Sequence, residues 1–174
     1  MREIVKLANM VNIQYTINAP LSTEKAFDFF INNKLSKYYR NISNGHKYFT
    51  LRQGEKMRVC SLIDCEEIAG NQKIKHEYYV SEIINNERIH YYSKPSIVEI
   101  ELPWKTICSK SNSYVYYDFE KDSNLHTNIR LTIGIQFFGK GEKIFSTLVG
   151  GLEPWKKHYI EEMNGLKNVL MDYN

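Results

Sequence analysis

Apolar and polar side chains alternate in the first ordered-looking segment of the chain. Ile13, Tyr15 and Ile17 are separated by polar residues, and this period of two is typical of a strand with one buried face. Pro20 follows almost directly. Because proline has no N–H to give to a sheet, it should end the strand. The pattern predicts a short strand over residues 13–18.

The period changes to that of a helix immediately after Pro20. Ser22 is a good N-cap, and Glu24 lies in the first turn, where the helix dipole favours an acidic side chain. Apolar residues then recur at helical spacing, at Ala26, Phe27, Phe30 and Ile31. We expect a short helix here, followed within residues 32–45 by a second short helix and a loop.

Most of the chain between residues 46 and 138 has strand character. Turn residues separate the segments and no helical period intervenes, which indicates an antiparallel meander rather than a parallel sheet. The Lys94–Pro95 step interrupts one segment and suggests a sheet edge or a bulge. The predicted strand segments are residues 46–55, 56–68, 72–84, 88–102, 113–120 and 126–138.

Residues 142–173 return to a helical period. Two apolar stripes are separated by GGLEP at residues 150–154, where two glycines and a proline should kink or break the helix. The stripes are Ile144, Phe145, Leu148, Val149 and Leu152, and then Trp155, Tyr159, Met163, Leu166 and Leu170. We therefore predict a long C-terminal helix in two pieces.

Composition indicates an ordinary globular chain. Its 174 residues suit a single domain, 1–174, and its net charge of +3 is spread without a basic block, which argues against nucleic-acid binding. No apolar run resembles a signal peptide or approaches the ~20 residues that span a bilayer, so stable membrane insertion is not expected. The three cysteines lack redox or zinc spacing, which favours a reducing compartment and a cytoplasmic location.

Aromatic residues make up 13% of the chain, and tyrosine doublets account for many of them. Three doublets fall in strand segments, at Tyr78–Tyr79, Tyr91–Tyr92 and Tyr116–Tyr117. Neighbours in a strand point to opposite faces. Each of these doublets should therefore place one ring inside the protein and one outside.

The order of these elements resembles that of the START-related helix-grip superfamily (SRPBCC), which contains the birch-pollen allergens and the polyketide cyclase and dehydrase-like proteins. INAPLSTEKAFDFF resembles its strand-to-helix opening, and EIAGNQKIKHEYYVSEIINNERIHYYS its central hairpins. YVYYDFEKDSNLHTNIRLTIGIQF resembles its last two strands, and MNGLKNVL the end of its long helix. The resemblance covers residues 12–171, with GGLEP and KPSIVEIELPWKTICSK as departures.

This resemblance implies an α+β helix-grip fold. A curved antiparallel sheet of about six or seven strands would surround a long, kinked C-terminal helix, with two short helices after the first strand. A cavity between sheet and helix would hold a hydrophobic or amphipathic small molecule, such as a lipid or a polyketide. The two departures fall where the cavity of the family opens.

Strand parity identifies the side chains that should line this cavity. If Val80 and Phe119 occupy the inward positions that they have in the family, residues two apart from them also face inward. On the last strand the apolar residues share one parity, and the helix contributes an aromatic face. The candidate cavity-lining residues are His76, Tyr78, Tyr91, Tyr117, Phe119, Leu131, Ile133, Ile135, Phe137, Trp155, Tyr159 and Met163.

Few patterns indicate catalysis. The five histidines lack metal-ligand spacing, and no nucleophile motif or phosphate loop is present, so we expect no metal and no cofactor. His158 and Glu161 could share a helix face, where a surface hydrogen bond is expected. His76 should be a satisfied core histidine rather than an acid or base. Glu82 has the parity of Val80 and would hint at acid–base chemistry if buried, although exposure at a strand end is the simpler expectation.

The main functional prediction is a protein that binds a hydrophobic or amphipathic small molecule, admitted by mobility at Gly150–Gly151. The first alternative is a cyclase- or dehydratase-like enzyme that uses the same cavity, in which tyrosine, His76 or Glu82 moves protons. The second alternative is a homodimeric interaction module with an aromatic surface. Its exposed rings would include Tyr79, Tyr92 and Tyr116.

Overall fold

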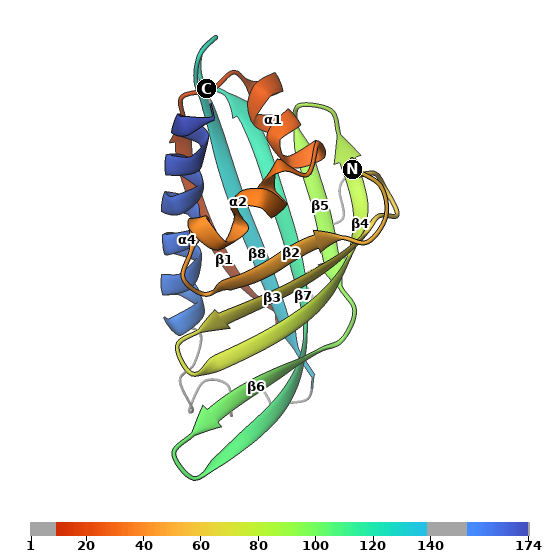
Figure 1. Cartoon of the computed structure of the whole chain (residues 1–174), viewed down its shortest axis with the longest axis vertical. Helices are drawn as coiled ribbons and strands as arrows, with labels where there is room; N and C mark the ends of the chain where they lie inside the picture. The colour runs from red at the N-terminus through yellow and green to blue at the C-terminus, as the bar shows by residue number, and fades with distance from the viewer. Residues whose placement is uncertain (1–9, 139–152, 174) are drawn as a thin grey trace.

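The computed structural model of the protein describes residues 10–138 and 153–173. Within them, a strand and two short helices precede seven further strands and a long helix (Figure 1), which is the predicted α+β order. The elements are β1 (Met10–Ala19), α1 (Thr23–Ile31), α2 (Lys34–Ile42), β2 (His46–Leu51), β3 (Leu62–Ala69), β4 (Gln72–Ile84), β5 (Arg88–Ser93), β6 (Ser96–Leu102), β7 (Lys105–Lys121), β8 (Thr127–Phe137) and α4 (Glu153–Asp172).

The strands form one antiparallel sheet in the order β1-β8-β7-β5-β4-β3-β2. β6 lies off this path and pairs with both β4 and β7. The sheet curves so strongly that β2 and β3 cross over the direction of β7 and β8, while α4 runs alongside β1 (Figure 1). The predicted helix-grip fold is therefore confirmed.

The described residues contain eight strands rather than six or seven because the Lys94–Pro95 step divides segment 88–102. β5 ends at Ser93 and pairs with the C-terminal halves of β4 and β7. β6 begins at Ser96 and pairs with the N-terminal ends of the same two strands. The proline thus marks the point where the chain moves along the same two partner strands, and the β6–β7 hairpin extends beyond the other strands (Figure 1).

The first helix begins where the sequence predicts. The Ser22 hydroxyl accepts a hydrogen bond from the Lys25 backbone N–H at 3.4 Å and caps α1. Phe27 and Phe30 of this helix meet Phe119 of β7 edge to face, with ring centroids 5.3 Å apart in both pairs. These rings fill one end of the interior.

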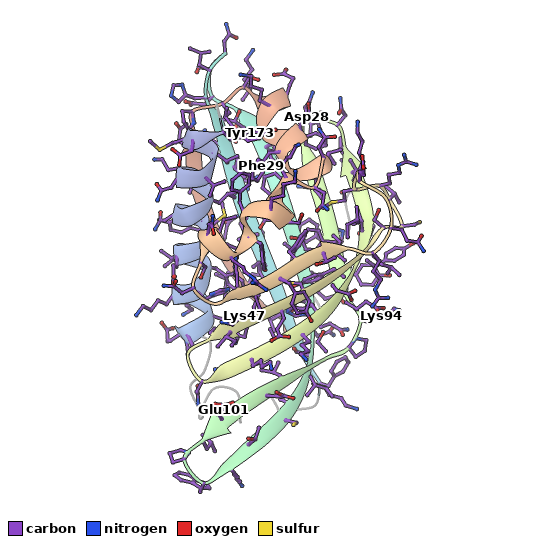
Figure 2. The ribbon with its side chains drawn as sticks, in the orientation of Figure 1. Asp28, Phe29, Lys47, Lys94, Glu101 and Tyr173 are labelled. Atoms are coloured by element: carbon purple, nitrogen blue, oxygen red, sulfur yellow. The ribbon has the colours of Figure 1, made fainter. Side chains whose placement is uncertain are left out.

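The last helix, α4, packs on β1 and α2. At its C-terminal end the ring of Tyr173 meets Phe29 of α1 edge to face, at 5.0 Å between centroids (Figure 2). Its buried face contains the predicted stripe from Trp155 to Leu170. The other helical piece predicted, residues 142–152, lies outside the described residues together with Gly150 and Gly151, so the kink stays a prediction.

Three strand predictions were wrong at one end. The strand predicted at 113–120 begins at Lys105. Segment 56–68 is a strand only from Leu62, because the chain turns just before it and Cys60 has a φ of +71°. β2 ends at Leu51 rather than at residue 55, and Gly54 follows with a φ of +77°. A left-handed backbone cannot continue a pleated strand.

The three cysteines are all free thiols, which we expected to be buried or half-buried, and that expectation holds only for Cys65. Cys60 and Cys108 are exposed, and Cys65 is buried.

Among the described residues, no helix is long and apolar enough to cross a membrane.

Candidate functional site

The predicted cavity-lining residues converge beneath α4. All twelve except Phe137, whose side chain lies outside the described part, are buried. Phe119, Leu131 and Met163 belong to the packed core. The remaining eight contribute to two small cavities, which share Tyr159 as a lining residue, and these are His76, Tyr78, Tyr91, Tyr117, Ile133, Ile135, Trp155 and Tyr159.

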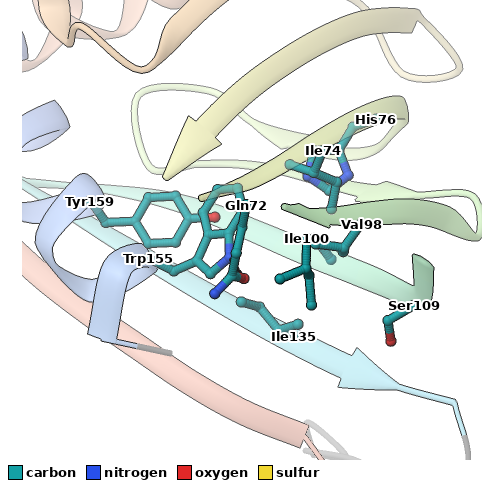
Figure 3. Close-up of a pocket in the computed structure, with 10 residues that line it drawn as sticks. Gln72, Ile74, His76, Val98, Ile100, Ser109, Ile135, Trp155 and Tyr159 are labelled. Carbon is teal, nitrogen blue, oxygen red and sulfur yellow. Dashed lines mark hydrogen bonds between the residues drawn. The ribbon is translucent and has the colours of Figure 1, made fainter. Parts of the chain in front are cut away.

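The first cavity lies next to β6 and has a volume of about 20 Å³. Figure 3 shows Trp155 and Tyr159 projecting from α4 toward the strands that form its other wall. The Trp155 indole N–H donates to the Gln72 side-chain oxygen at 2.6 Å, which ties the start of α4 to the start of β4. The residues that line this first cavity are Gln72, Ile74, His76, Val98, Ile100, Ser109, Ser113, Ile135, Trp155 and Tyr159.

The inward face of β7 explains why space is left at this end. Ser109, Ser111 and Ser113 face inward and are buried, and beyond them the same face carries Val115, Tyr117 and Phe119. Small side chains leave volume between sheet and helix that the larger rings fill further along. We call the region around these three serines the serine end.

Two of these serines have hydroxyls for which the described residues provide no hydrogen-bond partner. The Oγ atoms of Ser109 and Ser111 are buried and find no hydrogen-bond partner among the described residues. A buried hydroxyl without a partner costs free energy. The serine end therefore offers an apolar wall with polar groups available to a bound molecule.

The second cavity, of about 10 Å³, lies near α2, where the interior is strongly polar. Two buried carboxylates, Glu67 and Glu162, line it together with several tyrosines. Two buried histidines, His46 and His158, stand beside these carboxylates. We call this region the carboxylate end.

The geometry of the carboxylate end follows from two local pairings. His46 of β2 lies directly opposite Glu67 of β3 in the antiparallel register, so their side chains share a face. His158 and Glu162 are four residues apart on α4 and also share a face. The helix pair faces the strand pair, so that His46 Nε2 lies 3.8 Å from Glu162 Oε2 and His158 Nε2 lies 3.8 Å from Glu67 Oε2.

Hydrogen bonds hold one atom of each of these four side chains. The Tyr39 hydroxyl donates to Glu67 Oε1, and the Cys65 thiol donates to the same oxygen at 3.3 Å. The Tyr117 hydroxyl donates to Glu162 Oε1 at 2.8 Å. The histidines are held through their Nδ1 atoms, which lie 2.8 Å from the Tyr39 carbonyl oxygen for His46 and 3.4 Å from Ser43 Oγ for His158.

The charges of this cluster shift its pKa values in opposite directions. Burial raises the pKa of Glu67, but His158, His46 and His76 together with the bond from Tyr39 outweigh burial and lower it. Burial lowers the pKa of His46, but the negative charges of Glu162 and Glu67 outweigh burial and raise it. The cluster therefore favours an ionised Glu67 beside a protonated His46 when nothing else is bound.

His76 behaves differently, although it is also buried. Its Nδ1 lies 3.1 Å from Ser96 Oγ, and its ring stacks on Tyr78. Burial lowers the pKa of His76 to about 4, against a smaller opposing effect of Glu67. It is thus a neutral core histidine with a satisfied nitrogen at pH 7, as the sequence led us to expect.

The structure contradicts the sequence interpretation of His158 and decides between the two expectations for Glu82. His158 is buried and contacts Ser43 and Glu67, so its predicted surface pairing with Glu161 was wrong. Glu161 instead accepts a hydrogen bond from the Asn44 backbone N–H at 3.3 Å. Glu82 is exposed because a register shift after Val80 breaks the alternation of β4, so it is no internal acid.

The outward rings of the doublets lie next to other aromatic rings. Tyr92 meets Tyr79 at 5.4 Å and Tyr114 at 6.4 Å between ring centroids, and Tyr116 stacks on His90 at 3.9 Å. Each doublet therefore sends one ring inward and one outward, as predicted.

Sequence reasoning missed the carboxylate end, although part of the signal was present. His158 and Glu162 lie within the same helical stripe as Trp155 and Tyr159, and a stripe that buries aromatic residues also buries its polar members. Glu67 has the same strand parity as the buried Cys65. His46, at the first position of β2, had no such signal.

Comparison with known proteins supports the fold and nothing finer. No family model matches the chain, and no curated protein matches it. A protein from Thermus thermophilus has a TM-score of 0.69 at 11% identity, with 94% of this chain and 99% of that chain covered. The major latex-like protein 151 from Panax ginseng has a TM-score of 0.63 at 8% identity, with 94% and 99% covered.

A third solved structure carries a family name in common with the sequence resemblance. The START superfamily protein from Mycobacterium smegmatis has a TM-score of 0.62 at 10% identity, with 96% of this chain and 100% of that chain covered. At such identities the likeness concerns the backbone arrangement. The chain thus has the helix-grip fold of the START-related structures.

Proposed function

We propose that the protein binds a hydrophobic or amphipathic small molecule at the serine end, between the sheet and α4. The helix-grip fold is typical of proteins that bind hydrophobic ligands. Burial of the ligand's apolar surface would supply the affinity, at roughly 25 cal/mol per Å² before the costs of association.

The observation that carries this proposal is the combination of apolar walls and unpartnered hydroxyls at one end of the interior. Ile74, Val98, Ile100 and Ile135 supply the apolar lining. Ser109 supplies this lining with a buried hydroxyl that has no hydrogen-bond partner among the described residues, and Ser111, whose hydroxyl also has none, lies two residues further along the same face of β7. Binding sites for small molecules are mostly apolar, with a few placed polar groups that fix orientation.

The ligand must enlarge the cavity that it enters. A volume of about 20 Å³ is close to that of a single water molecule. The adjacent β6–β7 hairpin extends beyond the rest of the sheet, and Trp104 at its tip is 76% exposed. We expect this hairpin to move outward from α4 when the ligand binds, because little of the core holds its tip.

The test begins with native mass spectrometry of the protein from its own source, followed by extraction of any small molecule that it carries. The fluorescent probe 1-anilinonaphthalene-8-sulfonate then reports apolar binding in vitro. Ser109→Val fills the cavity from β7 and should weaken probe binding by about 10-fold. The matched control is Cys108→Val, because Cys108 is the adjacent, exposed residue of the same strand.

The two variants separate a cavity site from a surface site. Weaker binding by Ser109→Val alone places the probe at the serine end. Equal binding by both variants and the parent protein would show that the interior of this end takes no ligand.

An enzymatic function is a second candidate, because the carboxylate end contains a buried phenol paired with a carboxylate. Tyr117 donates to Glu162 within the lining of the second cavity, an arrangement that could move a proton. The extracted molecule distinguishes the two functions. A molecule returned unchanged after incubation with fresh protein supports binding, and a product of different mass supports catalysis.

A further inference from the structure

The carboxylate end contains three buried ligand-type atoms that have no hydrogen-bond partner among the described residues. His46 Nε2, Glu67 Oε2 and His158 Nε2 are buried and find no hydrogen-bond partner within the described parts of the chain. All three atoms lie within 4.8 Å of one another. Buried polar atoms without a hydrogen-bond partner cost free energy, and three of them lie together here.

The spacing of these atoms is too wide for hydrogen bonds and close to that of metal ligands. The distance from His158 Nε2 to Glu67 Oε2 is 3.8 Å, beyond the range of a hydrogen bond. Ligands at about 2.0–2.2 Å from a tetrahedral zinc ion stand roughly 3.3–3.6 Å apart. An ion between them would therefore need only small inward movements of the side chains.

The outer hydrogen bonds already orient the histidines for such an ion. The Tyr39 carbonyl oxygen can only accept, so His46 Nδ1 carries the proton and, in the neutral ring, Nε2 presents a lone pair. His158 Nδ1 faces Ser43 Oγ, which accepts from the Gly45 backbone N–H at 3.2 Å. Metal-ligating histidines are usually held in this way, through the ring nitrogen that does not bind the metal.

The outer bonds orient the carboxylates as well. Tyr39 and Cys65 hold Glu67 Oε1, which leaves Oε2 toward the histidines. Tyr117 holds Glu162 Oε1, and Glu162 Oε2 lies 3.8 Å from His46 Nε2. Two neutral imidazoles, two carboxylates and one divalent cation would have no net charge, which suits a buried position.

We propose that His46, Glu67 and His158 bind a divalent transition-metal ion of the zinc type, with Glu162 beside His46 as a neighbouring negative charge. Two imidazole nitrogens and carboxylate oxygens are a donor set that zinc accepts. All four side chains are at least nine-tenths buried, so the site is closed and structural rather than open to substrate. The ion would join β2 and β3 to α4 and clamp the helix onto the sheet.

The close packing around the site fits this role. A Cβ atom added at Gly45 would lie 2.2 Å from the Ile68 carbonyl oxygen and 2.7 Å from His158 Cε1. Only glycine therefore lets the β2 strand start so close to the His158 ring. The turn before β2 and the helix α4 are therefore packed closely together beside the proposed ion site.

The test uses full-length protein without a histidine tag, freed of metal by EDTA and then titrated with Zn²⁺ alone. We expect one zinc per chain by elemental mass spectrometry and a higher Tm in the zinc-bound protein. Substitution by Co²⁺ should give visible absorption bands, which report nitrogen and oxygen ligands directly and need no variant. Glu67→Gln and His158→Gln should each weaken zinc binding by at least about 100-fold.

The control variant is His126→Gln, because His126 is exposed and lies far from the cluster in the β7–β8 turn. It should leave the zinc affinity unchanged. Circular dichroism and thermal unfolding establish that each variant is folded before its affinity is compared. The proposal is overturned if the parent protein binds neither Zn²⁺ nor Co²⁺ at micromolar concentration, or if Glu67→Gln and His158→Gln bind zinc as well as His126→Gln.

Discussion

The serine end and the carboxylate end lie under the same helix but use buried polar groups in opposite ways. At the serine end, Ser109 and Ser111 have hydroxyls with no partner among the described residues, within mostly apolar walls. At the carboxylate end, one oxygen of Glu67 and one oxygen of Glu162 each accept a hydrogen bond from a tyrosine hydroxyl. The first arrangement leaves apolar room and neutral hydroxyls for an organic guest, whereas the second joins the helix to the sheet through charged groups, three atoms of which are available to an ion.

Two histidines show the same contrast. His46 and His76 are both buried on inward faces of the sheet. Nearby carboxylates raise the pKa of His46 despite its burial, while burial lowers the pKa of His76 to about 4. Burial alone therefore does not predict protonation, because the neighbouring charges determine its direction.

The largest expected effect is a loss of stability when a polar side chain is truncated at the carboxylate end, compared with the same kind of truncation at the serine end. With EDTA present at pH 7, Glu67→Ala should lower the free energy of unfolding by about 3–5 kcal/mol, because it leaves the Tyr39 hydroxyl and the histidines without their buried partner. Ser111→Ala should cost less than about 1 kcal/mol or stabilise the fold, since its hydroxyl has no described partner to lose. Urea unfolding of both variants measures the difference.

This pair of variants tests the comparison directly. Similar losses of stability at both positions would mean that the Ser111 hydroxyl has a partner in the folded protein. A small loss in Glu67→Ala would mean that the carboxylate end contributes little to holding α4.

The next effect is a pH dependence that His76 should impose on stability. Its pKa is about 4 in the folded protein and 6.5 in the unfolded chain, so the unfolded chain takes up a proton first as the pH falls. The stability from this residue is complete above pH 6.5 and is lost between pH 6.5 and 4, by about 3 kcal/mol in total. His76→Gln should flatten this part of the pH profile of urea unfolding.

Direct titration provides the check on that assignment. The ring protons of His76 should keep their neutral chemical shift in NMR spectra until close to pH 4. A midpoint near 6.5 would contradict the assignment, since it would mean that water reaches the ring. The exposed His126 serves as the internal reference.

Much of the fold was predictable because long strands repeat a simple period. The apolar parity of residues 129–135 and the burial of Tyr78 and Val80 agree with alternation along β8 and β4. The predictions failed where one residue breaks the period locally. Cys60 has a left-handed backbone, and a register shift follows Val80, and neither is encoded in a two-residue repeat.

The candidate site was only half predictable, for a related reason. The serine end is formed by alternate positions on the inward faces of single strands, so strand parity, with Val80 placed inward by the family resemblance, identified His76 and Ile135 but not Ser109, Ser111 and Ser113. The carboxylate end joins His46, Glu67 and a helix pair from three separate elements. No spacing in the sequence brings them together, because their contact depends on how closely α4 approaches the sheet and α2.

The close contact between α4 and α2 leads to the smallest of the predicted effects on stability. A Cβ atom at Gly165 of α4 would lie 1.9 Å from the Ile42 carbonyl oxygen at the end of α2. In an isolated helix, Gly→Ala is favourable by about 1 kcal/mol. Here Gly165→Ala should instead destabilise the protein by about 1–3 kcal/mol, because backbone must move to accommodate the methyl group.

The exposed neighbour Asn164 supplies the matched control on the same helix. Asn164→Ala should change the free energy of unfolding by no more than about 0.5 kcal/mol. If Gly165→Ala stabilises the protein as it would an isolated helix, then α4 does not need its close contact with α2. In that event the position of the residues after Ile42, which contact His158, would not depend on the packing of α4 against α2. The carboxylate end would then be held together by its hydrogen bonds alone.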